Sequence, residues 1–167
     1  MGCLGVHFAL SDAEVHQLCA LADDASRLEY LKEAIEENNF TDHEDLLAPS
    51  YKTWDAMHRA LADGHLTWDG GEYPLNHVVL GGQLLYGKPD YIMSLKNTDE
   101  VLDIAAALPG ITESEFRRRY FAINAAKYGF PLSEDDFGYT WEAFNDVRDL
   151  YAKAASLGRC VLFTASQ

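Results

Sequence analysis

Two short apolar runs at opposite ends of the chain constrain its fold more than any other feature. Residues 2–10 (GCLGVHFAL) and 159–164 (RCVLFT) are nearly continuous in apolar character, whereas much of the sequence between them carries apolar residues at helical spacing. Runs of this kind are typical of strands that are covered on both faces. We therefore expect the two ends of the chain to form neighbouring interior strands of one sheet.

Helix signals separate these two runs. Residues 11–14 (SDAE) spell a capping box, in which a serine side chain caps the backbone three residues on and a glutamate returns the bond. Apolar positions three and four apart predict a helix over residues 52–63, ended by Gly64, and a long helix over about 140–157, ended by Gly158. We expect about five to six helices in all.

The middle of the chain is rich in turns and short β-branched runs. Residues 78–80, 84–86 and 91–93 are candidate strands, whereas residues 40–50 are expected to be a loop closed by Pro49. Strands at both ends and in the centre, with helices between them, favour an α/β fold of the mixed α+β kind with one mixed sheet. At 167 residues, with no linker or repeat, residues 1–167 are expected to form a single domain.

The charge of the chain excludes some classes of partner. Asp and Glu number 27 against 13 Lys and Arg, which gives a formal net charge of −14. Such a field repels phosphate backbones and anionic lipids, so we expect neither nucleic acid nor membrane as a partner. Residues 1–50 carry eleven of the acids and two bases, which fits either a solvated helical face or a docking surface for a basic protein partner.

The sequence predicts no metal and no cofactor. Cys3, Cys19 and Cys160 share no close spacing, and the six histidines are scattered without an HExxH or HxH pattern.

No apolar run approaches the ~20 residues that a membrane helix needs, and the first ten residues lack the basic stretch of a secretory signal. We therefore expect a cytoplasmic protein.

The helix expected over residues 52–63 carries the best catalytic candidates. Trp54 and His58 are one turn apart, and Asp55 lies three residues before His58, where its carboxylate could orient the imidazole. A histidine beside a carboxylate is the beginning of a general base, but no nucleophile signature such as GxSxG accompanies it. The alternative is a packed histidine beside a core tryptophan.

Binding residues are expected in a cleft beside the same helix. The candidates are Trp54, Gly81, Gly82 and Tyr91. A Gly-Gly pair after an apolar run lets a ligand approach the backbone, but without the GxGxxG frame or the lysine of a P-loop it also fits a simple turn or bulge.

Several short motifs resemble those of the YfbM-like family, small bacterial proteins grouped under a domain of unknown function. The resemblance spans almost the whole chain. It rests on the MGCLG start, the Trp54-Asp55…His58…Leu61…Gly64 helix, Pro74-Leu75 followed by Leu80-Gly81-Gly82, Tyr86-Gly87 through Tyr91, and the closing helix and strand over residues 142–163. Asp90 stands where the family commonly has arginine, so no role of that arginine carries over. The resemblance implies a mixed α/β fold and bacterial origin, and no mechanism.

Two functions follow from these patterns. The first is a non-enzymatic binding or regulatory protein with an acidic surface, such as an immunity-type protein that neutralises a basic toxin. The alternative is a small hydrolase or transferase with His58 as general base, oriented by Asp55. The sequence leaves the partner, the substrate and the oligomeric state open.

Overall fold

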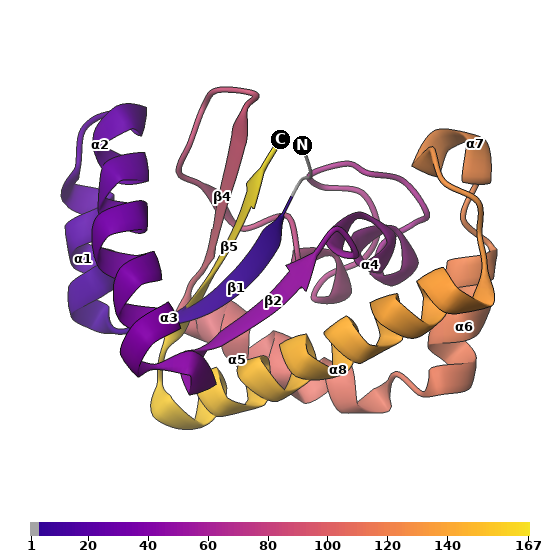
Figure 1. The fold of residues 1–167 in the computed structure, drawn as a ribbon. Helices are drawn as coiled ribbons and strands as arrows, with labels where there is room; N and C mark the ends of the chain where they lie inside the picture. Colours follow the sequence, from indigo (N-terminus) through magenta and orange to yellow (C-terminus); the bar gives the residue numbers. More distant parts are fainter. Residues whose placement is uncertain (1–3) are drawn as a thin grey trace.

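A five-stranded antiparallel sheet forms the centre of the molecule. The computed structural model describes residues 4–167 (Figure 1). Across the sheet, the strands are β2 (Leu47–Tyr51), β1 (Gly5–Leu10), β5 (Cys160–Ser166), β4 (Tyr91–Lys96) and β3 (Gln83–Leu84). The first and last strands pair with each other in the interior of the sheet, so the expectation for the chain ends is confirmed. The start of the MGCLG motif, residues 1–3, lies outside the described residues.

Side chains alternate between the two faces of the sheet, and each face has its own core. Val161 and Phe163 of β5 belong to one apolar cluster, and Leu162 between them belongs to the other. This two-faced burial explains why the terminal runs are almost continuously apolar, since a strand covered on both sides has no solvent face to mark with polar residues.

Helices cover both faces and make a three-layer arrangement (Figure 1). Residues 4–167 contain seven helices if the unbroken segment α2–η1–α3 is counted as one, slightly more than the five to six expected. On the face of Leu162 lie α1 (Asp12–Ala20), α2 (Asp24–Tyr30), η1 (Leu31–Glu36) and α3 (Glu37–Asp42). On the face of Phe163 lie α4 (Trp54–Leu61), α5 (Thr98–Ala107), α6 (Glu113–Phe121), the short α7 (Ala125–Tyr128) and the long α8 (Glu134–Leu157). No helix of this described chain combines the length and apolar content needed to cross a membrane.

Local capping rules set the helix boundaries. Ser11 and Glu14 form the expected capping box at the start of α1. Ser133 accepts a hydrogen bond from the backbone of Asp136 and begins α8 at Glu134, earlier than the start near residue 140 that the apolar spacing predicted. The end of α8 at Gly158, in the left-handed conformation, is as expected. Such bonds join residues three or four apart, so the sequence alone can predict them.

Three strand expectations are wrong. The sheet is antiparallel at every pairing rather than mixed. Residues 47–50, expected to lie in a loop, belong to β2 at the edge of the sheet, where Pro49 is tolerated because the edge needs no donor on its outer side. Residues 78–80, expected to be a strand, lie in bends whose carbonyl groups accept hydrogen bonds from side chains instead of from a neighbouring strand.

Candidate functional site

His58 is packed inside the protein. Its Nε2–H donates to the carbonyl of Thr67 at 2.8 Å, and its Nδ1 is buried with no hydrogen-bond partner among the described residues. Burial lowers the pKa of His58 to about 4, because the charged imidazolium would lose its hydration there. The ring therefore holds the loop after α4 in place in its neutral form.

Asp55 does not orient His58. Its Oδ1 accepts a hydrogen bond from Nε of Arg59 at 2.6 Å, one helical turn along α4. The same guanidinium donates to the carbonyls of Gly64 and Lys127, so it ties α4 to the following loop and to α7. The structure thus lacks the Asp55–His58 hydrogen bond that the sequence analysis expected, and the catalytic role of the pair stays a prediction.

Gly81 and Gly82 form a left-handed turn above β4, with φ angles of 83° and 71°. A Cβ at Gly82 would strike the carbonyl oxygen of Leu95, so the turn packs directly on the strand. The carbonyl of Gly81 accepts a hydrogen bond from Ser94 Oγ at 2.5 Å. This close approach of two backbone segments explains the glycine pair without any ligand.

A buried polar network holds the same segment. His7 Nε2–H and the hydroxyl of Tyr151 both donate to the carbonyl of Val78, at 2.8 and 2.7 Å. The fully buried Lys96 donates to the carbonyl of Val79 and to Ser94 Oγ. Burial lowers the pKa values of His7, to about 3, and of Lys96. These three side chains satisfy the carbonyls of Val78 and Val79, which no neighbouring strand pairs.

The four expected binding residues do not converge. Trp54 is buried in the core on the Phe163 side of the sheet, with its ring centroid 5.6 Å from that of Phe163. Tyr91 packs on the opposite face, where its hydroxyl donates to Glu36 at 3.4 Å; burial and this carboxylate raise its pKa to about 12. Because the sheet separates them, Trp54 and Tyr91 cannot line one cleft.

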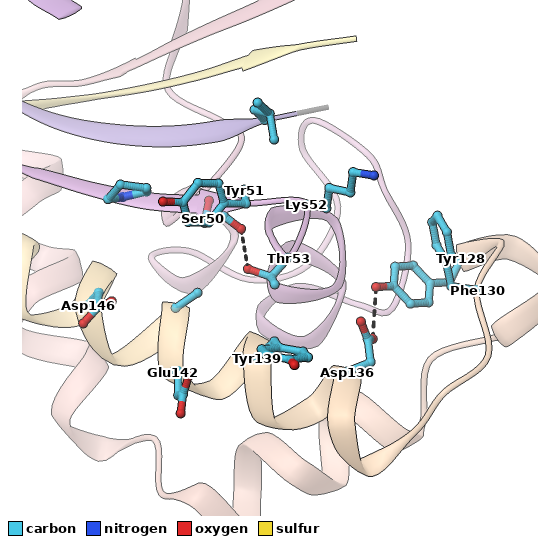
Figure 2. Close-up of a pocket in the computed structure, with 13 residues that line it drawn as sticks. Ser50, Tyr51, Lys52, Thr53, Tyr128, Phe130, Asp136, Tyr139, Glu142 and Asp146 are labelled. Atoms are coloured by element: carbon cyan, nitrogen blue, oxygen red, sulfur yellow. Dashed lines mark hydrogen bonds between the residues drawn. The ribbon is translucent and has the colours of Figure 1, made fainter. Parts of the chain in front are cut away.

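A large pocket lies elsewhere, between the end of β2 and the first half of α8 (Figure 2). Its volume is about 520 Å³, within the range of roughly 300 to 1,000 Å³ that is usual for ligand sites. Four large side chains around it are at least half exposed, namely Leu4, Tyr51, Phe130 and Tyr139. Exposed apolar groups gathered in this way mark interaction surfaces more often than isolated ones do.

Tyr51, in the pocket wall, has an unusual backbone conformation. Its φ of 47° makes it the one non-glycine residue with positive φ within residues 4–167. A left-handed conformation costs a bulky residue of order 1 kcal/mol or more and is kept only where the surroundings impose it. The turn at Tyr51 ends β2 and leads through Lys52 and Thr53 into α4.

Asp136 is a fixed carboxylate in the pocket wall. Its Oδ2 accepts hydrogen bonds from the hydroxyls of Tyr120, at 2.5 Å, and Tyr128, at 3.1 Å. Burial and this carboxylate raise the pKa of both phenols, which therefore stay protonated donors. Within the described chain, Oδ1 of Asp136 accepts no hydrogen bond from a side chain or backbone group.

A second depression of about 210 Å³ continues the pocket along α8. The two share Pro49 and Asp146, and together we call them the β2–α8 groove. Six acids and two lysines line it, which leaves a formal charge of minus four; they are Asp136, Glu142, Asp146, Asp149, Glu44 and Asp45, with Lys52 and Lys153. Partial burial and the nearby charges of Asp149 and Glu142 raise the pKa of Asp146.

Sequence reasoning missed this groove. One signal was present, because Glu142, Asp146 and Asp149 recur at the spacing of one helical face. The exposure of Phe130 and Tyr139, however, depends on which elements of the fold leave them uncovered.

No group of three or more His, Cys, Asp and Glu side chains in residues 4–167 is placed to hold a metal ion.

Comparisons with known proteins bear on the family and the fold. The profile of DUF1877, described as a domain of unknown function, matches residues 1–164. A solved structure titled as a protein of unknown function, YfbM from Escherichia coli, superimposes with a TM-score of 0.64 at 19% sequence identity, covering 97% of this chain and 99% of that one. No curated protein matches the chain. The resemblance drawn from the sequence motifs is thereby confirmed, and the chain belongs to the DUF1877 family.

Proposed function

We propose that this protein is a non-enzymatic binding protein whose β2–α8 groove holds a basic protein partner. The observation that carries the proposal is the coincidence of a pocket of about 520 Å³, four exposed apolar side chains and a net charge of minus four in one groove. Each feature serves a separate part of binding, since apolar anchors give affinity and charge gives orientation and association rate.

The acidic residues of α8 support this proposal because the repulsion between them destabilises the free protein. Glu142 and Asp146 are four residues apart, and Asp149 follows three residues later, so like charges face one another on a single helix face. Such pairs destabilise a helix by roughly 0.2–0.5 kcal/mol each. A basic partner would relieve this repulsion on binding.

The geometry of α4 supports a binding protein over the hydrolase or transferase alternative. A general base must reach its substrate, whereas His58 is fully buried and already bonded to a backbone carbonyl. Asp55 is engaged by Arg59.

The test compares two charge-matched double variants. In the groove variant, Asp146→Asn and Asp149→Asn remove two exposed acids of α8. In the control variant, Glu33→Gln and Glu37→Gln remove two exposed acids on the other side of the sheet. The probe is a lysine-rich peptide of alternating Lys and Gly, and its affinity is measured by calorimetry at low and physiological salt.

We expect the groove variant to bind this peptide at least about threefold more weakly than the control variant, because each removed charge within reach is worth some tenths of a kcal/mol. Equal weakening by the two variants would show that only the net charge attracts the peptide, and the proposal would then fail.

A further inference from the structure

The pocket end of the groove combines aromatic faces with carboxylates. Tyr51, Phe130 and Tyr139 present exposed rings, and Asp136 and Glu142 supply negative charge in the same wall (Figure 2). Aromatic rings attract cations through their negative faces, by roughly 0.5–2 kcal/mol each according to exposure. We propose that this pocket binds the guanidinium group of one arginine side chain that the basic partner presents, an inference that rests on the function proposed above.

Asp136 is the element that favours guanidinium recognition. Two phenols hold its Oδ2, so the carboxylate is fixed before any ligand arrives. A fixed carboxylate loses little conformational entropy when it accepts a hydrogen bond from a ligand. Oδ1 is the free acceptor on this group within residues 4–167, and it offers an N–H donor a charge-assisted hydrogen bond.

Arginine suits this pocket better than lysine does. A guanidinium is planar, stacks on aromatic rings and is more weakly hydrated than an ammonium, so it enters a mostly apolar pocket at lower desolvation cost. Lys52 is the one base among the described lining residues, and its exposed side chain can turn its ammonium into water.

A second copy of this chain is a poorer occupant. Each copy carries a formal charge of −14, so two copies repel each other, and a net charge of minus four of this total lies in the groove, where the contact would form. A basic segment with an exposed arginine meets opposite charge at the same place.

The experiment uses three capped pentapeptides of the form Gly-Gly-X-Gly-Gly, in which X is arginine, citrulline or lysine. Citrulline has nearly the shape of arginine but no charge. Binding to the intact protein is followed by the backbone amide signals of Tyr51, Phe130 and Tyr139 in nuclear magnetic resonance titrations. We expect the arginine peptide to bind at least about tenfold more tightly than the citrulline peptide, which corresponds to about 1.4 kcal/mol, and more tightly than the lysine peptide.

Matched variants distinguish a contribution of the Tyr139 ring to binding from an effect of the substitution on folding. Tyr139 is 68% exposed, so Tyr139→Ala should leave the protein folded while lowering its affinity for the arginine peptide at least about threefold. Tyr139→Phe, which keeps the ring, should retain binding. Leu157→Ala, at a 53% exposed position near the end of the same helix, is the control and should change nothing.

Three results would overturn the inference: equal affinities for arginine and citrulline peptides, shifts confined to residues outside the pocket, or unaltered binding by Tyr139→Ala. The proposed function fails separately, because it depends on Asp146 and Asp149 and is measured with the lysine-rich peptide. If that peptide distinguishes the groove variant from its control while arginine and citrulline bind alike, the groove binds basic partners but the pocket does not select arginine.

Discussion

Replacing His58 by glutamine should change how the stability of the protein depends on pH. Burial lowers the pKa of His58 from 6.5 to about 4 in the folded state. When the pH falls below 6.5, the unfolded chain takes up a proton at this residue and the folded chain does not, so the folded state loses stability. This contribution is intact above pH 6.5 and is lost progressively as the pH falls toward 4.

The size of the effect follows from the two pKa values. One pKa unit corresponds to about 1.4 kcal/mol, and between pH 7 and pH 5 the protonation of the unfolded chain lowers the free energy of unfolding by about 2 kcal/mol. Glutamine can still donate toward the carbonyl of Thr67 but does not titrate. His58→Gln should therefore be less stable than the wild type at pH 7, and the difference should shrink by about 2 kcal/mol at pH 5.

Urea denaturation of both proteins at pH 7, 6 and 5 measures this difference. Comparing two proteins at each pH cancels the titration of the many carboxylates, which both share. Met57→Ala, a nontitrating core variant on the same helix, is the control, and its difference from the wild type should not depend on pH. A constant difference for His58→Gln as well would show that His58 can be protonated in the folded protein, and the argument from burial would be wrong.

Two further substitutions test the backbone at the groove and in the core. Tyr51→Asn should raise the free energy of unfolding by up to about 1 kcal/mol, since asparagine tolerates the left-handed conformation, and should lower the affinity for the arginine peptide. Thermal melting measures the first effect and the titration described above measures the second. A lower melting temperature would contradict the backbone strain inferred from φ 47°. Gly5→Ala should destabilise by about 1–3 kcal/mol, because its Cβ would lie 2.7 Å from Cδ1 of Trp54. Gly110→Ala, where the new Cβ meets nothing within 4 Å, is the control, and equal losses at the two glycines would refute the steric reason.

The motifs that revealed the family are explained by packing. Gly5 belongs to the opening motif and Trp54 to the helix motif, and the missing side chain of the first makes room for the ring of the second. Gly82 belongs to the Leu-Gly-Gly motif and lies against the carbonyl of Leu95. These residues identify the fold strongly, yet they do not mark the groove, because the residues that a core requires are different from those that a surface presents to a partner.

The sequence determined what depends on neighbouring residues. The capping box at Ser11, the end of α8 at Gly158 and the apolar character of β1 and β5 follow from hydrogen bonds and burial patterns within a few residues, and each can be read from the chain itself. The seven-helix, five-strand arrangement differs from the expectation chiefly at β2 and residues 78–80, whose backbone groups find partners far along the chain.

Only the tertiary structure decided where a site could lie. Asp55 had two possible partners on its own helix, and it pairs with Arg59, whose buried guanidinium is also held by the carbonyls of Gly64 and Lys127. Tyr51, Phe130 and Tyr139 are separated by up to 88 positions in the sequence and meet because β2 lies along α8. Whether an aromatic ring is buried or faces solvent depends on what else packs over it, and that information is carried by the assembled layers rather than by any one segment.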